Sequence, residues 1–304
     1  MPVRTAPTKG PWEAPAVFPL GLAAITHRRF PPGPARIDDA FSRRHFADLT
    51  AAYGVDHRPD LVQDAAGNTF AAMAGELLAG LGPSAPPAPS DPSAPHDARS
   101  APIDLAVVAH ATPDLDCRLA AVTALSELVP GGPLSFTVSE CGSNAPFAAL
   151  RLAAAYARRH GHRRVALFVL DQATFPYRSG RELAGDAGLA LLLTDTGSLG
   201  RLTLWQRTAT GPDDVAAAVR TALADLDATG CPVVAGAAVD PARDLPGHPG
   251  RIVRTPPGHP ASGALTALAA DPAWSAGREQ RIVVVDHEPD TGDLAVCLIE
   301  RGGR

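Results

Sequence analysis

The feature that most constrains the fold is a regular alternation of short apolar runs and helical patterns from about residue 103 onward. Runs such as IDLAVVAHA, RRVALFVLD and QRIVVVDHE have the length and the β-branched content of buried strands. The segments between such runs, for example RLAAVTALSELV and DDVAAAVRTALADLDATG, have the apolar period of helices. Continuous apolar strands separated by helices are typical of a sheet that is covered on both faces. The sequence therefore predicts an α/β protein.

The N-terminal third is organised differently. Residues 1–35 are punctuated by Pro and Gly and contain one apolar patch, VFPLGLAAI. We expect one helix that starts near Asp38 or Asp39 and a second over about Asn68–Leu81, with Asn68 as its N-cap. The Pro/Ala/Ser segment at about 83–102 cannot bury enough apolar surface to fold alone, which predicts a flexible loop or linker there.

Length and charge set broad limits on the protein class. A chain of 304 residues suffices for one large α/β domain or for two halves of about 150 residues. A net charge of −5 gives no general attraction to nucleic acid or to an anionic membrane. No apolar run approaches the roughly 20 residues that span a bilayer, and the Pro-rich start lacks the apolar core of a signal peptide. We therefore expect a cytoplasmic protein with no nucleic-acid or membrane partner.

Cysteine and lysine usage narrows the chemistry. The four cysteines stand singly, without a CxxC pair, so a zinc, iron–sulfur or other metal site is not expected. The only lysine is Lys9, whose Pro-rich context is poor for a Schiff base or a phosphate-binding loop. Pyridoxal-phosphate enzymes and P-loop nucleotide hydrolases are therefore disfavoured.

Cys141 stands where the strand pattern LSFTVSE gives way to the helical pattern NAPFAALRLAAAYARRHG. A residue at such a junction lies near a helix N-terminus, where free N–H groups and the helix dipole stabilise a thiolate. The same N–H groups can donate to a developing oxyanion, and Gly142 permits a sharp turn and the close approach of a substrate. This placement is compatible with a nucleophile and equally with a small core residue at a tight turn.

Three segments in order resemble the thiolase fold and, within it, ketoacyl-ACP synthase III: DLAVVAHATPDLD, LSFTVSECGSNAPFAALRLAAAYARRHGHRRVALFVLD and GDAGLALLLTD. ATPD (Ala111–Asp114) takes the place of the family's Thr-rich segment, and GDAGLALLL (Gly185–Leu193) matches its GDGAGA-like strand. The resemblance implies two related βαβ-type halves in α-β-α-β-α layers, at residues 1–200 and 201–304. It also implies that Cys141 accepts an acyl group from an acyl-CoA or an acyl carrier protein.

The second half departs from the family pattern. The family's histidine in an HxxxN-like motif has no counterpart in CPVVAGAAVDPARD, where residues 236–239 read GAAV, and His259 replaces the family's asparagine. The resemblance thus leaves Cys141 and His259 as the catalytic pair, with His259 moving the proton and Gly142 marking the backbone oxyanion donors. His287, in the DHEPDTG segment that replaces a Gly-rich turn, and His110, at a strand end, are accessory candidates.

The function that the resemblance implies is acyl transfer through an acyl-Cys141 thioester, in polyketide or other secondary metabolism. No tightly bound cofactor is expected, and the substrate is an acyl-CoA or a phosphopantetheine-linked acyl group. Two alternatives remain: a decarboxylative ketoacyl synthase with an atypical site, and a non-catalytic partner subunit of a condensing-enzyme heterodimer. The strand LSFTVSE is expected to pair with a second copy or with a ketosynthase-like subunit, and an acyl carrier protein is a further candidate partner.

Overall fold

The computed structural model describes residues 14–63, 65–81, 102–129 and 131–302. Their strands form one ten-stranded sheet in the order β3-β2-β4-β5-β1-β6-β10-β9-β7-β8. The strands are β1 (Ala16–Arg29), β2 (Leu105–His110), β3 (Leu134–Val138), β4 (Arg164–Asp171), β5 (Ala187–Thr194), β6 (Gly200–Arg207), β7 (Val233–Ala235), β8 (Ile252–Arg254), β9 (Arg281–Glu288) and β10 (Asp293–Glu300). The α-helices are α1 (Ala40–Tyr53), α2 (Phe70–Leu81), α3 (Ala121–Leu128), α4 (Ala145–His160), α5 (Val215–Asp225), α6 (Pro241–Asp244), α7 (Gly263–Ala270) and α8 (Pro272–Ser275), and short 3-10 turns are η1 (Pro59–Leu61) and η2 (Gly142–Asn144). The loop predicted at about 83–102 lies outside the described residues except for Pro102.

The sheet consists of two equivalent halves. In the first half β2 pairs in parallel with β3 and β4, and β5 and β1 follow in antiparallel order. In the second half β7 pairs in parallel with β8 and β9, and β10 and β6 follow in antiparallel order. The halves meet where β1 pairs with β6. The two related halves that we predicted are therefore present, whereas a domain boundary at residue 200 stays a prediction because all strands share one sheet.

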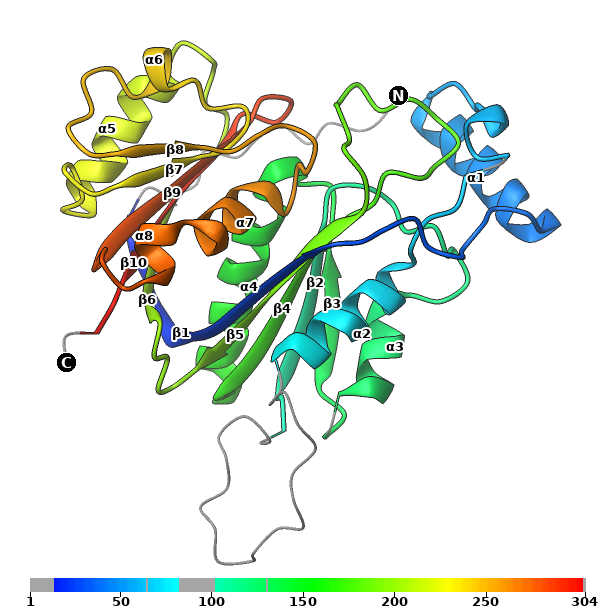
Figure 1. Cartoon of the computed structure of the whole chain (residues 1–304), viewed down its shortest axis with the longest axis horizontal. Coiled ribbons are helices and arrows are strands. Elements are labelled where there is room, and N and C mark those ends of the chain that lie inside the picture. Colours follow the sequence, from blue (N-terminus) through cyan, green and yellow to red (C-terminus); the bar gives the residue numbers. More distant parts are fainter. Residues whose placement is uncertain (1–13, 64, 82–101, 130, 303–304) are drawn as a thin grey trace, which may run out of the picture.

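Helices cover both faces of the sheet and also fill the space between its halves (Figure 1). One apolar cluster packs α2 and α3 against β2, β4 and β5, and another packs α5 against β6, β9 and β10. The largest cluster contains α4 and α7, which lie between the two halves and contact strands of both. The result is the α-β-α-β-α layering that the resemblance predicted.

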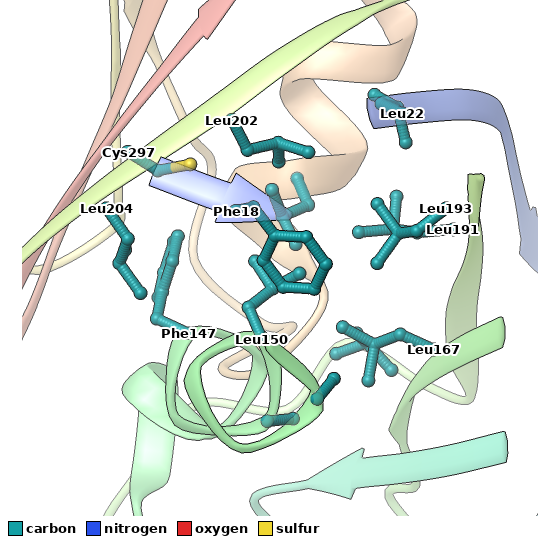
Figure 2. Packing of buried hydrophobic residues seen from close by; sticks show 14 of the residues in the cluster. Phe18, Leu22, Phe147, Leu150, Leu167, Leu191, Leu193, Leu202, Leu204 and Cys297 are labelled. Atoms are coloured by element: carbon teal, nitrogen blue, oxygen red, sulfur yellow. The ribbon is translucent and has the colours of Figure 1, made fainter. Parts of the chain in front are cut away.

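Helix α4 is built for this central position. Pro146 lies in its first turn, Gly161 ends it in the left-handed conformation, and basic side chains occupy its last turn, where they complement the helix dipole. Its buried face is rich in alanine, so that both sheet halves can approach the helix closely. Figure 2 shows its larger side chains, Phe147 and Leu150, packed beside Phe18 of β1.

Two sequence predictions about local structure have clear outcomes. Helix α1 starts next to Asp39, as predicted, and Asp39 caps it by accepting a hydrogen bond from the Ser42 N–H at 2.9 Å. The prediction of Asn68 as the cap of α2 is wrong: the Thr69 hydroxyl accepts from the Ala72 N–H at 3.2 Å. Asn68 instead donates from both its backbone and its side-chain nitrogen to the Asp186 carboxylate.

The patch VFPLGLAAI, which the sequence left without an assignment, lies in β1 at the centre of the sheet. Phe18, Leu20 and Leu22 are buried and alternate with more exposed residues, so the period of a strand is present. The register of β1 against β6 shifts between Val17 and Gly21. None of the helices in the described part of the chain combines the length and the apolar character needed to cross a bilayer.

Candidate active site

The chain turns sharply between β3 and α4. Glu140 and Gly142 both have left-handed backbones, with φ of 62° and 51°, and Cys141 lies between them. A left-handed backbone is uncommon for a residue with a side chain and is found where the surrounding structure holds it in place. The turn then continues through η2 into α4, so the predicted strand-to-helix junction is present at Cys141.

The surroundings of Cys141 disfavour a thiolate. The half-buried sulfur lies 3.4 Å from the Ser139 carbonyl oxygen. Burial raises the pKa of the thiol, and so do three nearby carboxylates, those of Asp293, Glu140 and Glu288, although Arg151 opposes them. This shift runs opposite to the one that we expected from the helix N-terminus alone.

A buried carboxylate occupies the position expected for an oxyanion at the start of α4. The Ser143 N–H donates to Glu288 Oε2 at 2.8 Å, and a Cβ atom added to Gly142 would lie 1.7 Å from the same oxygen. Arg181, on the loop between β4 and β5, donates to this oxygen at 2.6 Å. Burial alone would raise the pKa of Glu288, but hydrogen bonds from Arg181 and the Ser143 N–H outweigh it and lower the pKa. The backbone donors predicted beside Gly142 therefore face a carboxylate of the protein itself.

A cavity of about 470 Å³ opens beside this turn and is lined from both halves of the sheet. Ser143 of η2 lines it together with Thr255, which follows β8, and His259, which precedes α7. Asp286 and His287 of β9 complete its polar wall. Among the described residues, those that line this cavity do not include Cys141. Of the predicted catalytic pair, His259 lines the cavity and Cys141 does not. Ser143 is the residue before α4 that lines it.

Asp286 fills the space beside Gly236, the first residue of the GAAV segment. Ile282 and Val284 of β9 pack into the core around α4 and α7, so the alternation of the strand directs Asp286 toward the same face. A Cβ atom added to Gly236 would lie 2.2 Å from Asp286 Oδ1. The Asp286 carboxyl group therefore fills the space that a side chain at position 236 would need, and a glycine there permits it.

The Asp286 carboxyl group is buried and hydrogen-bonded. Burial raises its pKa well above the usual value, and hydrogen bonds from the His287 N–H and the Ser143 hydroxyl oppose this only in part. The Ser143 oxygen also lies 3.3 Å from the His287 carbonyl oxygen. Ser143 and Asp286 thus lie close together in the lining of the cavity.

His259 and Thr255, which also line the cavity, carry unpaired polar atoms. Within the described part of the chain, neither His259 Nδ1 nor Thr255 Oγ1 has a hydrogen-bond partner. Both side chains border the start of α7, since a Cβ atom added to Gly263 would lie 3.1 Å from Thr255 Cγ2 and 3.7 Å from His259 Cβ. Burial lowers the pKa of His259, against the charge of Asp171, and so favours the neutral imidazole.

The loop that carries His259 is held by Asp171 at the end of β4. This buried carboxylate accepts from the Ala261 N–H at 2.9 Å and from the Ser262 N–H and hydroxyl at 2.7 Å each. Since β4 belongs to the first half of the sheet, the contact fixes His259 relative to the strands beside α4.

Of the two accessory candidates, His287 lines the first cavity and His110 does not. His287 belongs to β9 and not to a turn, which corrects our prediction; its ring is buried, with Nε2 3.2 Å from the Thr210 carbonyl oxygen. His110 packs on the Phe70 ring with 5.0 Å between centroids, and burial lowers its pKa. It lines a second cavity of about 380 Å³, which shares Thr112 and Tyr177 with the first.

Sequence reasoning missed Ser143, Thr255 and Asp286. The alternation of β9 was the signal that places Asp286 with the core residues of that strand, but we had assigned DHEPDTG as a whole to a turn. Ser143 had no signal of its own beside a cysteine two residues earlier. In the described ranges no cluster of His, Cys, Asp and Glu is arranged to hold a metal ion.

The architecture matches that of known thiolase-fold enzymes. Neither a protein-family model nor a curated protein sequence matches the chain. Among solved structures, 3-oxoacyl-(acyl carrier protein) synthase III from Pseudomonas aeruginosa is similar with a TM-score of 0.58 and 14% identity, over 93% of this chain and 98% of the other. The tetronic acid condensing enzyme AbyA1 gives a TM-score of 0.61 and 15% identity, over 92% and 99%. The acyltransferase ChlB3 gives 0.54 and 14%, over 93% and 97%.

These likenesses show the fold. The chain is a thiolase-fold protein, as the order of its motifs predicted. Its sequence departs from the ketoacyl-ACP synthase III pattern that it resembles, with GAAV at residues 236–239 and with His259.

Proposed function

We propose that the protein transfers acyl groups from an acyl thioester through a covalent acyl-enzyme intermediate at the start of α4. The observation that carries the proposal is the cavity itself, in which the turn that begins α4 faces an imidazole, His259, from the other half of the sheet. A nucleophile beside groups that can take and return a proton is what a two-step acyl transfer needs. Cys141, the acceptor that the sequence predicts, lies on this turn and remains the first hypothesis for the attachment site.

The adjoining cavities suit an extended acyl donor. The second cavity is lined by the mostly apolar side chains of α1 and the following residues, including Leu49, Tyr53 and Val55. An alkyl chain there would leave its carbonyl group in the first cavity, because the two share Thr112 and Tyr177. An acyl-CoA or acyl-carrier-protein donor in polyketide or other secondary metabolism remains our proposal, supported by the resemblance and by a condensing enzyme of tetronic acid synthesis among the similar structures.

The test is to incubate the purified protein with a panel of acyl-CoA thioesters and to measure its intact mass. We expect the mass of one acyl group to be added, and to disappear again when a small thiol such as N-acetylcysteamine is supplied as acceptor. The matched control is Cys117→Ala, which removes another partly buried free thiol and should label as the wild type does. If no donor labels the protein, the acyl-transfer function is refuted.

A second candidate is the non-catalytic partner subunit, which one specific observation favours. The Ser143 N–H at the start of α4 already binds Glu288, and the pKa of the Cys141 thiol is raised by burial and neighbouring carboxylates. Within the described sheet, β3 pairs only with β2 and leaves an edge on which Leu134 is 48% exposed. This candidate predicts no acyl adduct and a stable complex with a ketosynthase-like chain, which co-expression and light scattering would detect.

The decarboxylative alternative has its own readout. A condensing enzyme would release carbon dioxide from malonyl-CoA and lengthen the bound acyl group, whereas an acyltransferase leaves malonyl-CoA unchanged. The absence of a side chain at Gly236 favours transfer, because the group that would stabilise the carbanion from this position is replaced by the Asp286 carboxyl group.

A further inference from the structure

We infer that the acyl acceptor is the Ser143 hydroxyl, with Asp286 as the proton acceptor and with Thr255 and His259 binding the carbonyl oxygen. The inference rests on the acyl-transfer function proposed above and changes the residue that carries the acyl group.

Cys141 and Ser143 differ in their access to the cavity: Ser143 lines it and Cys141 does not. The left-handed residues Glu140 and Gly142 place Cys141 with its sulfur near the Ser139 carbonyl oxygen, outside the residues that line the cavity. Ser143, two residues further along the chain, is buried and lines the cavity. Its N–H is fixed by Glu288, so its hydroxyl is held toward the polar wall formed by β9.

The Asp286 carboxyl group lies beside the Ser143 hydroxyl. A serine oxygen becomes nucleophilic when an adjacent base takes its proton. The Ser143 hydroxyl donates to the His287 carbonyl oxygen at 3.3 Å and lies beside the Asp286 carboxyl group, which lines the same cavity and in its ionised form can take the hydroxyl proton. The acids around Cys141 act in the opposite sense, because they oppose the formation of the thiolate that the sulfur needs.

Two residues that line the cavity, Thr255 and His259, each have a polar atom without a hydrogen-bond partner among the described residues. Thr255 is 8% exposed and its hydroxyl has no partner among the described residues, which is costly for a buried polar group unless a ligand supplies one. The same holds for Nδ1 of His259, which is half-buried. The Thr255 hydroxyl can donate, and so can His259 Nδ1 in the tautomer that carries the proton there; both side chains border the start of α7 and suit the carbonyl oxygen of a thioester, since Glu288 occupies the Ser143 N–H.

Acyl transfer to Ser143 proceeds in two stages. The Ser143 oxygen forms a bond to the thioester carbonyl carbon, and its proton passes to the Asp286 carboxylate. The carbon–sulfur bond then breaks, the leaving sulfur takes the proton from Asp286, and the products are a serine ester and a free thiol. The reverse step with an acceptor thiol, or with another nucleophile, returns the serine hydroxyl.

The experiment compares intact masses of four proteins after incubation with an acyl-CoA that labels the wild type. We expect Ser143→Ala to lose the adduct and Cys141→Ala to keep it. The wild-type ester should survive neutral hydroxylamine and be cleaved only in alkali, whereas Ser143→Cys should form a thioester that neutral hydroxylamine removes. Circular dichroism and thermal melting of Ser143→Ala verify that the variant folds.

Each other outcome counts against the inference in a distinguishable way. An adduct that is lost in Cys141→Ala, kept in Ser143→Ala and removed by neutral hydroxylamine places the acyl group on Cys141, so the inference fails while the acyl-transfer function stands. The absence of an adduct in the wild type with every donor refutes the function and the inference together. Should Ser143→Ala fail to fold, the hydroxylamine sensitivity of the wild-type adduct alone decides between ester and thioester.

Discussion

Replacing Arg181 by methionine tests the ion pair that closes the start of α4. The Arg181 side chain is 33% exposed, whereas the Glu288 side chain with which it pairs is 1% exposed. Arg181→Met therefore leaves a buried carboxylate without its counter-charge, while the methionine preserves much of the apolar stem of the arginine.

The size of the effect follows from what Glu288 retains. Removing one partner of a buried ion pair typically costs about 3–5 kcal/mol. Because Glu288 keeps hydrogen bonds from the Ser143 N–H at 2.8 Å and the Asp290 N–H at 3.1 Å, we expect the lower end, about 3 kcal/mol. With about 2.1 cal/mol/K of unfolding entropy per residue, 304 residues give about 0.6 kcal/mol/K, so Tm should fall by about 5 °C.

The pH dependence has a definite sign. In the wild type the pKa of Glu288 is lowered, so the stabilisation from the pair is present above the unfolded pKa and is lost as pH falls through the folded pKa. In Arg181→Met burial is no longer opposed by the guanidinium, the pKa of Glu288 rises above its unfolded value, and stability is lost as pH increases through it. The difference in Tm between the two proteins should therefore be largest near neutral pH and should shrink toward acid pH.

Scanning calorimetry of three variants completes the test. Arg178→Met, which removes an exposed arginine from the same loop, should change stability by less than about 0.5 kcal/mol. The double variant Arg181→Met/Glu288→Gln should recover most of the loss, since neither charge is then buried alone. An unchanged Tm for Arg181→Met, or a double variant as unstable as the single one, would refute the reasoning.

Three further predictions follow from the same geometry. Gly236→Ala should destabilise the protein by about 1–3 kcal/mol, because its Cβ would collide with the Asp286 carboxyl group. Combination with Asp286→Ala should relieve the loss, and additive Tm shifts of the two substitutions would contradict this. Cys141 should react with iodoacetamide at pH 7.5 more slowly than a peptide thiol, because the pKa of its thiol is raised, and Asp293→Asn should accelerate the reaction. Peptide-resolved mass spectrometry measures the rate, and a Cys141 that reacts faster than the peptide thiol would disprove the prediction. If β3 pairs with a second copy, Leu134→Lys at the exposed sheet edge should reduce the mass measured by light scattering to that of a single chain, and an unaffected dimer would exclude this edge as the interface.

Local patterns were enough to predict much of the architecture. The continuous apolar runs over β2, β4, β5 and β9 and the helical period over α4 and α5 show the α/β class directly, because each element reflects its own burial. Strand β1, which joins the two halves, was not predicted because Pro19 and Gly21 are typical of turns, although the buried residues around them alternate as in a strand. Its role depends on pairing with residues far along the chain, which a local window does not contain.

The site was predictable only in part, for a related reason. His259 was found because its motif lies in a short segment before α7. The contact between Ser143 and Asp286 joins η2 to β9, and the space that Asp286 fills exists only because position 236 is a glycine on a third segment. Cys141 was identified from its position at a helix start, but its pKa is raised by burial and by carboxylates of which Asp293 and Glu288 lie far along the sequence.

The attachment site of the acyl group tests the central claim most directly. Trypsin releases residues 119–151 as one peptide that contains both Cys141 and Ser143, since no Lys or Arg interrupts it before Arg151. Fragmentation of this peptide from acyl-CoA-treated protein separates the two positions. The account predicts that the added mass appears only in fragments that include Ser143. An acyl group on Cys141, or a peptide that remains unmodified with every donor, would contradict it.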